Sequence, residues 1–261
     1  MSLWHDVLTR TLRAIAHLLC RVHPEDLEKV PTEGPLILAA NHVNFIEVPI
    51  LYGHLHPRPI SGMAKAESWR NPFKHILFNT WGGIPVRRGE ADLDATRSAL
   101  RALQAGRILA IAPEGTRSHD GRLQRGHPGV AMLALRSGAP ILPVVYYGGE
   151  RLWSSLRRFR RTDFHIVVGD PFWVDPGGMP VDRYVRRQMA DQIMYQLAAL
   201  LPPEYRGVYA DLQSASETYL RFGPGASSNL VKAGCGSGQL DTSPGQRDRG
   251  IRSKGIYEAT V

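Results

Sequence analysis

A histidine and a carboxylate lie close together in the segment Asn41-His42-Val43-Asn44-Phe45-Ile46-Glu47. The apolar run at 36–38 predicts a short buried strand, and residues 46–55 are predicted to form a helix. His42 would then follow the strand, with Glu47 reaching back from the first helical turn. A carboxylate that accepts a hydrogen bond from one ring nitrogen leaves the other nitrogen free to take a proton. The pattern is consistent with an oriented general base, although an isolated histidine and glutamate at this spacing more often cap a helix.

Three further segments with the composition of binding loops also lie at the ends of predicted strands, at 82–88, 113–118 and 139–144. Arg88 and Arg117 each present a planar guanidinium that suits a phosphate monoester. Gly115 lets the backbone approach a ligand closely. A single arginine in such a place usually forms a surface salt bridge. The combination with a candidate base favours a site for a phosphorylated substrate.

Strands and helices alternate from residue 35 onward, which is typical of an α/β fold. We therefore predict a single domain with a mixed, largely parallel sheet flanked by helices. Ligands of such sheets bind at the ends of the strands, where the candidate segments lie. The predicted strands are 36–38, 60–64, 83–86, 107–112, 140–147 and 164–168, and the predicted helices are 46–55, 72–79, 90–105, 129–137 and 181–201.

Before the domain, residues 3–20 predict an amphipathic helix with Trp4, Leu8, Leu12, Ile15 and Leu19 at helical spacing. Such a helix can lie in a membrane interface or pack on the core of its own domain, and both interpretations stay open. We divide the chain into this helix at 1–22, a folded domain at 23–222 and a tail at 223–261. The tail is rich in Gly, Ser, Asp and Arg and is predicted to be disordered.

The 261-residue chain carries a formal net charge of +8, which favours an anionic partner. Nucleic acid is not expected, because the arginines are dispersed and no recognition motif is present. The basic cluster at 157–161 could contact anionic lipid headgroups or form a solvated surface. No run of apolar residues is long enough to span a bilayer, and the charged first apolar run does not resemble a secretory signal. Two cysteines, Cys20 and Cys235, favour a reducing compartment.

Several other kinds of site are not supported by the sequence. A P-loop, a dinucleotide-binding G-x-G-x-x-G and a G-x-S-x-G nucleophile elbow are all missing from the chain. His54 and His56 would place two imidazoles on one side of a strand, but no third ligand is near them in sequence. The sequence therefore predicts no metal site and no cofactor.

Together, the four segments resemble the motifs of the glycerolipid acyltransferase family, which includes the 1-acylglycerol-3-phosphate acyltransferases. The first family motif is Asn-His, four residues and Asp, which corresponds here to Asn41-His42 and Glu47. The second ends in an arginine and corresponds to residues 82–88. The third, Phe-Pro-Glu-Gly-Thr-Arg-Ser, is matched over 113–118, with Ala112 replacing Phe. The fourth, an apolar run around a proline, corresponds to residues 141–144. The resemblance covers about 35–200.

The resemblance implies transfer of a fatty acyl group from acyl-CoA or acyl-carrier protein to the hydroxyl of a lysophospholipid, with 1-acylglycerol-3-phosphate as the first choice. It makes residues 23–222 the acyltransferase domain and implies work at the cytoplasmic face of the membrane, as a peripheral or monotopic protein. His42 would be the general base and Glu47 its orienting carboxylate. The substrate-binding positions implied by the motifs are Arg88, Glu114, Gly115, Thr116, Arg117 and Pro143.

Glu47 departs from the aspartate usual in the family. The extra methylene moves the carboxylate by about 1.5 Å, and an uncompensated displacement of about 1 Å can cost around a hundredfold in rate. We therefore keep two hypotheses: an active membrane-surface acyltransferase, and a catalytically weak or inactive lipid-binding homologue. Acceptor-dependent release of thiol from acyl-CoA separates them.

Overall fold

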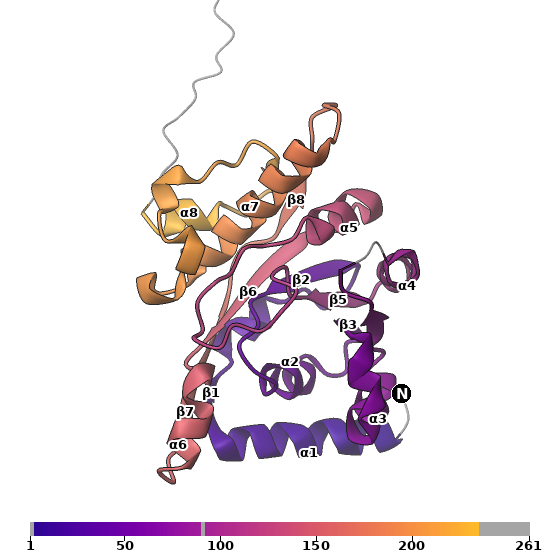
Figure 1. Cartoon of the computed structure of the whole chain (residues 1–261), viewed down its shortest axis with the longest axis vertical. Helices are drawn as coiled ribbons and strands as arrows, with labels where there is room; N and C mark the ends of the chain where they lie inside the picture. Colours follow the sequence, from indigo (N-terminus) through magenta and orange to yellow (C-terminus); the bar gives the residue numbers. More distant parts are fainter. Residues whose placement is uncertain (1–2, 90–91, 235–261) are drawn as a thin grey trace, which may run out of the picture.

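A nine-stranded mixed sheet organises the computed structural model, which describes residues 3–89 and 92–234 (Figure 1). The main strand order is β1-β7-β6-β2-β5-β3-β4, and β8 and β9 extend from β6. The five strands from β6 to β4 are parallel, whereas β7 and β8 run antiparallel to β6. The bounds are β1 Cys20–His23, β2 Leu36–Ala40, β3 Ile60–Lys65, β4 Ile84–Val86, β5 Ile108–Ile111, β6 Ile141–Tyr147, β7 Thr162–Val168, β8 Phe172–Val174 and β9 Leu220–Phe222.

Strand β2 is central, and all five of its residues are buried. It pairs with β5 on one side and β6 on the other, so that Ile37 lies opposite both Leu109 and Ile141. Successive side chains of a strand point to opposite faces of the sheet. Ile37 and Ala39 accordingly enter one hydrophobic core, and Leu36, Leu38 and Ala40 enter the other. A strand buried on both faces reads as a continuous apolar run, as 36–38 does.

Helices cover both faces of the sheet (Figure 1). Helices α1 (Leu3–Leu19) and α2 (Glu47–Leu55) pack on one face, and α4 (Leu93–Gln104), α5 (Gly129–Ser137) and α7 (Arg183–Leu200) pack on the other. The shorter helices are α3 (Pro72–Thr80), α6 (Leu152–Leu156) and α8 (Asn229–Lys232). The α/β class, the largely parallel sheet and the N-terminal helix are confirmed.

Several helix ends carry the residue types that local chemistry favours. The carboxylate of Asp92 accepts a hydrogen bond from the Ala95 amide at the start of α4, and Asn71 caps α3 in the same way ahead of Pro72. Helix α5 ends at Gly138, whose φ of 66° lies in the left-handed region that glycine tolerates. These signals explain why the predicted and observed bounds of α3 and α5 agree closely.

Helix α1 both packs on the core and exposes apolar side chains. Thr9 and Ala16 of the helix are buried, as is Cys20 directly after it, whereas Trp4 and Leu18 are exposed. Arg161 anchors the end of α1 by donating a hydrogen bond to the carbonyl of Cys20. Among the described residues, no helix has the length and apolar character needed to cross a bilayer. The two interpretations of this helix are therefore compatible, because each applies to a different face.

The ordered chain extends past residue 223, where the sequence predicted a disordered tail. Helix α8 packs against α7, and the side chain and amide of Asn229 both donate hydrogen bonds to Oε1 of Gln196 at 3.0 Å. Asn229 in turn accepts a hydrogen bond from the amide of Asp170. These buried polar contacts hold a segment whose sparse apolar residues gave no periodic signal. Residues 235–261, including Cys235, lie outside the described residues.

Candidate functional site

Three of the four predicted site segments gather at the carboxyl edge of the parallel strands. The fourth, 139–144, was also expected at a strand end that binds a ligand, but it enters β6 from the amino edge and continues inside that strand. The His42 segment follows β2, residues 113–118 follow β5, and Arg88 follows β4. Strands β2 and β5 are direct neighbours, and β4 lies two strands beyond β5. Neighbouring strands are about 4.8 Å apart, so the whole set spans only a few strand spacings. The fold therefore brings together segments that are as many as 76 residues apart in sequence.

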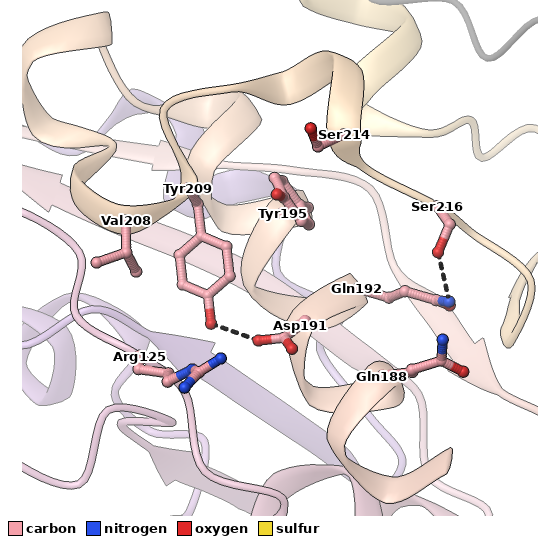
Figure 2. A pocket seen from close by; sticks show the side chains of 9 residues that line it. All are labelled: Arg125, Gln188, Asp191, Gln192, Tyr195, Val208, Tyr209, Ser214 and Ser216. Atoms are coloured by element: carbon pink, nitrogen blue, oxygen red, sulfur yellow. Dashed lines mark hydrogen bonds between the residues drawn. The ribbon is translucent and has the colours of Figure 1, made fainter. Parts of the chain in front are cut away.

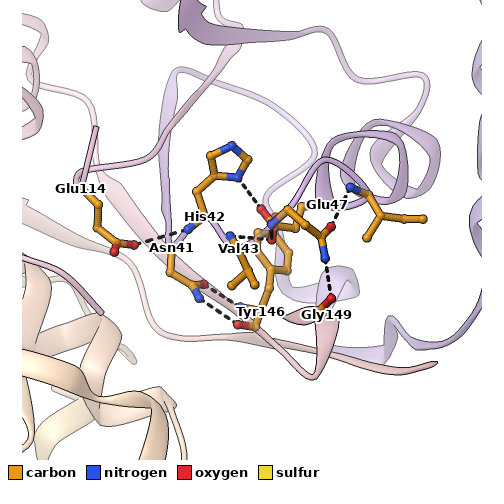
Figure 3. Close-up of polar contacts among 9 residues, drawn as sticks. Asn41, His42, Val43, Glu47, Glu114, Tyr146 and Gly149 are labelled. Atoms are coloured by element: carbon orange, nitrogen blue, oxygen red, sulfur yellow. Dashed lines mark hydrogen bonds and ion pairs between the residues drawn. The ribbon is translucent and has the colours of Figure 1, made fainter. Parts of the chain in front are cut away.

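His42 and Glu47 form the closest polar pair of this edge (Figure 3). The Nδ1 atom of His42 lies 2.6 Å from Oε2 of Glu47. An ionised carboxylate only accepts hydrogen bonds, so Nδ1 carries the proton and Nε2 has the free lone pair. The side chain of His42 is 28% exposed, whereas that of Glu47 is 4% exposed. A partly accessible imidazole held by a buried carboxylate has the geometry of an oriented base.

The second oxygen of Glu47 fixes the loop that carries His42. Oε1 accepts hydrogen bonds from the amides of Val43 and Asn44, each at 2.8 Å. Helix α2 begins at Glu47 itself, so the carboxylate reaches back across the turn that precedes the helix. Two backbone donors and one imidazole compensate for burying the carboxylate.

Two asparagines, Asn41 and Asn44, hold the same loop. The sequence alone suggested no role for their side chains. The side chain of Asn41 exchanges two hydrogen bonds with the backbone of Tyr146, at 2.7 and 2.8 Å, and so continues the pairing of β2 with β6 (Figure 3). The side chain of Asn44 donates to the carbonyl of Gly149 and accepts from the amide of Ile46. Asn41 belongs to a recognised motif, but only the fold reveals its partner, because Tyr146 is 105 residues away.

Glu114 is buried behind His42 and does not lie on the surface of the site. It is 2% exposed, and its two oxygens accept hydrogen bonds from the amides of His42 and Gln124. Burial raises the pKa of Glu114 to about 7, against the effect of these two donors. The amide of Ser118 also bonds the carbonyl of His42, at 2.7 Å. Glu114 thus joins the loop after β5 to the loop after β2.

The remaining residues of that loop are more accessible. Gly115 has a φ of 67°, and a Cβ atom there would lie 3.0 Å from the ring of His127, so the turn favours glycine. Thr116 and Arg117 follow directly and are exposed. Arg88 is exposed in the loop that follows β4. These three side chains are available to a substrate from solvent.

Pro143 lies in a different environment. It is buried inside β6 opposite Ala39, and its carbonyl accepts a hydrogen bond from the amide of Gly169. Proline has no amide proton to give to a neighbouring strand. Its position shapes the centre of the sheet, and it is not among the residues that line the cavities described below.

An apolar cavity of about 120 Å³ opens beside His42 and Glu47. Trp81 and Tyr52 stack in its wall with ring centroids 4.6 Å apart, and Trp81 donates a hydrogen bond to Thr9 of α1. A Cβ atom on Gly62 would lie 2.9 Å from the Tyr52 hydroxyl, so glycine makes room for that side chain. The other lining residues are largely apolar and include Leu38, Val48, Leu51, Met63, Phe78 and Ile111.

Tyr146 also lines this cavity, and its hydroxyl has no hydrogen-bond partner within the described part of the chain. Burial raises the pKa of this hydroxyl, and the nearby charge of Glu47 adds to the effect. The hydroxyl is therefore a neutral donor beside the His42–Glu47 pair. No sequence pattern singles out this hydroxyl, because Tyr146 reads as one residue of a buried strand.

A second cavity, of about 510 Å³, is polar and shares no lining residue with the first (Figure 2). Hydrogen bonds join some of its lining side chains to one another: Tyr209 donates to Asp191 at 2.8 Å, and Gln192 donates to Ser216 at 2.9 Å. Arg187 of α7 donates to the carbonyl of Gly126. This network fixes the far end of the loop that carries Arg117, which gives it a structural role.

The comparisons with known proteins agree with this arrangement. Residues 21–147 match the family described as Acyltransferase, and they include the His42 segment, Arg88 and residues 113–118. The chain carries an acyltransferase domain. The matched range ends at the close of β6, so it contains all five parallel strands together with the loops at the carboxyl ends of β2, β3, β4 and β5.

Curated relatives of this acyltransferase domain differ in their named acceptors. The chain is 27% identical to the 1-acyl-sn-glycerol-3-phosphate acyltransferase of Bacillus subtilis (strain 168), over 61% of this chain and 78% of the relative. It is 32% identical to the lyso-ornithine lipid O-acyltransferase of Pseudomonas aeruginosa, over 52% and 59%. The chain thus spans most of the first relative and less than two thirds of the second.

A solved structure shares the fold. The crystal structure of the 1-acyl-sn-glycerophosphate (LPA) acyltransferase PlsC from Thermotoga maritima aligns with a TM-score of 0.52 and 21% identity, over 75% of this chain and 81% of that one. At this identity the similarity supports the architecture of the acyltransferase domain.

The buried position of Glu114 predicts a pH-dependent stability. Its pKa rises from the ordinary 4.5 to about 7 in the folded chain, so the folded state holds a proton that the unfolded state has lost between these values. The contribution of Glu114 to the free energy of unfolding is therefore fully present below pH 4.5 and is lost as the pH rises to 7. The Glu114→Gln variant cannot ionise at this position. Between pH 5 and pH 8 its free energy of unfolding should therefore rise by about 2–4 kcal/mol relative to that of the wild type.

Urea unfolding of both proteins at several pH values measures this difference, and Glu204→Gln on an exposed turn is the control. Parallel stability profiles for wild type and Glu114→Gln would mean that the carboxyl titrates in the ordinary range.

Proposed function

We propose that the protein transfers a fatty acyl group from acyl-CoA or acyl-carrier protein to the free hydroxyl of a lysophospholipid, with 1-acylglycerol-3-phosphate as acceptor and phosphatidate as product. The observation that carries the proposal is the 2.6 Å contact between Nδ1 of His42 and Glu47 beside an apolar cavity. The name of the Bacillus subtilis relative supports this acceptor. The Pseudomonas aeruginosa relative makes a lyso-ornithine lipid the competing choice.

In the proposed reaction, Nε2 of His42 takes the proton of the acceptor hydroxyl as its oxygen attacks the thioester carbonyl. Glu47 stabilises the resulting imidazolium through the proton on Nδ1. The carbon–sulfur bond breaks, and His42 returns the proton to the thiolate as the thiol leaves. Both substrates bind together, and no acyl-enzyme is formed. Cys20, the cysteine within the described residues, is buried in the strand after α1, and burial raises the pKa of its thiol to about 11.

The two sides of His42 suit the two substrates. The apolar cavity, lined by residues such as Leu51 and Phe78, would receive the start of an acyl chain. Arg88 and Arg117 would bind the acceptor phosphate from the open side, with Gly115 and Thr116 shaping the backbone beside it. Glu114 would act through the position of the His42 loop, because both its oxygens already accept backbone hydrogen bonds. Pro143 would contribute through β6, where it lies opposite Ala39 of the central strand.

The alternative of an inactive lipid-binding homologue depended on Glu47 being misplaced. The short contact with His42 supports an active site, because the longer carboxylate still reaches the imidazole. Acceptor-dependent release of thiol from acyl-CoA remains the deciding measurement, and its absence with every lysophospholipid tested would favour the inactive homologue.

A membrane surface is the proposed place of work. The outward face of α1 exposes Trp4, Val7, Ile15 and Leu18. The turn between α6 and β7 exposes Phe159 within the basic segment 157–161. Interfacial helices combine aromatic and aliphatic side chains with arginine in this way. We place these surfaces on the cytoplasmic leaflet, where the acyl donors are found and anionic lipids attract basic segments.

Replacing His42 tests the general base. His42→Ala should lower kcat by about 10²–10⁴-fold, because proton transfer by a positioned side chain contributes that much. His75→Ala, on the exposed surface of α3, is the matched control and should keep full activity. Circular dichroism shows whether both variants are folded. A folded His42→Ala enzyme with more than about a tenth of wild-type activity would remove His42 from the base role.

Replacing the two arginines tests acceptor binding. Arg88→Ala and Arg117→Ala should each raise KM for 1-acylglycerol-3-phosphate by about 10–100-fold and leave KM for the acyl donor nearly unchanged, because a charged hydrogen bond contributes about 1.5–3 kcal/mol. Arg122→Ala, an exposed arginine on the same loop, is the control. A selective increase in donor KM would assign the arginines to the acyl donor instead.

Replacing apolar residues on the outer face of α1 tests the membrane surface. Trp4→Ser with Leu18→Ser should weaken binding to vesicles that contain phosphatidylglycerol by about tenfold or more, because each side chain gains about 1.5–3 kcal/mol on leaving water. Leu93→Ser, equally exposed on α4 at the opposite face of the sheet, should bind as wild type. If the wild type and both variants sediment equally with vesicles, α1 packs on the core and does not contribute to membrane binding.

A further inference from the structure

The junction of α1 and α2 carries a cluster of metal-binding side chains outside the catalytic site. His5 and Asp6 lie in the first turns of α1, and His56 directly follows α2. Their ligand atoms, one from each residue, all lie within 4.8 Å of one another. From the sequence, His54 and His56 were expected on one side of a strand, with no third ligand near them in sequence. The structure instead places them at the end of a helix, and α1 supplies two further ligands.

The spacing of these atoms fits a tetrahedral ion. Nε2 of His56 lies 2.9 Å from Oδ1 of Asp6, and Nδ1 of His5 lies 3.5 Å from the same oxygen. Zinc bonds of about 2.0–2.2 Å at tetrahedral angles place neighbouring ligand atoms about 3.3 Å apart. Both observed distances lie close to that value, and the ligand atoms of the remaining pair, His5 and His56, lie within 4.8 Å of each other.

The chemistry of the three groups selects the class of ion. Two imidazoles and one carboxylate suit zinc and similar transition metals, whereas magnesium and calcium prefer oxygen ligands alone. The side chains of His5 and His56 are 17% and 21% exposed, so they are partly shielded and still accessible.

We propose that His5, Asp6 and His56 form a binding site for a divalent zinc-class ion that joins α1 to the end of α2. In the bound state His56 would present the Nε2 lone pair to the ion and carry its ring proton on Nδ1. Three protein ligands leave the fourth position to water. The site is structural, because it fastens the outermost helix to the helix that begins at Glu47. It does not depend on the proposed acyl transfer.

A second histidine pair at the same helix junction provides an internal control. Nε2 of His17 lies 3.1 Å from Nε2 of His54, and Nδ1 of His54 bonds the carbonyl of Ile50. Burial lowers the pKa of both imidazoles, and within the described part of the chain no carboxylate bonds either ring. This pair is held by a direct imidazole–imidazole hydrogen bond and should not contribute to ion binding.

The test uses the full-length chain without a purification tag, stripped of metal by a chelator. Cobalt(II) chloride is added while visible absorption is recorded, and zinc chloride binding is measured by calorimetry. We expect one ion per chain with the absorption of four-coordinate cobalt. Asp6→Asn and His56→Gln should each weaken binding by at least about tenfold, and His17→Gln should leave affinity within about twofold.

Thermal unfolding provides a second measurement that does not depend on spectroscopy. Zinc should raise the Tm of wild type and His17→Gln but not that of Asp6→Asn, because an ion that binds only the folded state stabilises it. Asp6→Asn keeps the shape and a hydrogen-bond acceptor, so it decides the question even if His56→Gln fails to fold. Lack of cobalt absorption in wild type, or equal affinity in Asp6→Asn, would overturn the proposal and leave Asp6 as a hydrogen-bond acceptor only.

Discussion

Burial of the Glu47 carboxylate is the constraint on which the rest of the site depends. A charged carboxylate removed from water is strongly destabilising unless hydrogen bonds replace the lost hydration. The amides of Val43 and Asn44 and the ring of His42 supply three such bonds. These donors exist only when the loop after β2 has one particular conformation, so the charge and the loop stabilise each other. Asn44 then ties that conformation to Gly149, which lies just past the carboxyl end of β6.

The same constraint explains how a glutamate can occupy a position where the family usually has aspartate. The effect of an extra methylene depends on where the backbone of the residue lies, and here α2 begins at Glu47 itself. The carboxylate therefore starts from the helix end and reaches back over the turn to both the amides and the imidazole. The longer side chain thus still reaches the imidazole and both amides, which motif spacing alone cannot reveal.

The sequence predicted what depends on local patterns and missed what depends on distant partners. The strand at 36–38, the helix at 129–137 and the pairing of His42 with Glu47 followed from apolar runs, a terminal glycine and spacing within one turn. The short strands β8 and β9 gave no signal, because three residues are too few for a periodic pattern. The burial of Glu114 was equally hidden, since its two donors come from separate loops.

The order of elements also brings the proposed membrane surface close to the apolar cavity. Helix α1 presents Trp4 and Leu18 outward, while its Thr9 accepts a hydrogen bond from Trp81, which lines the cavity. One side of the helix thus meets solvent or lipid and the other supports the cavity wall. A helix with its side chains is about 10 Å across, so only that thickness would separate a bilayer beneath α1 from the wall at Trp81. Because Trp81 also stacks on Tyr52 of α2, a displacement of α1 would be transmitted to the helix that begins at Glu47. The outermost helix is therefore connected, through Trp81 and Tyr52, to the helix that begins at Glu47.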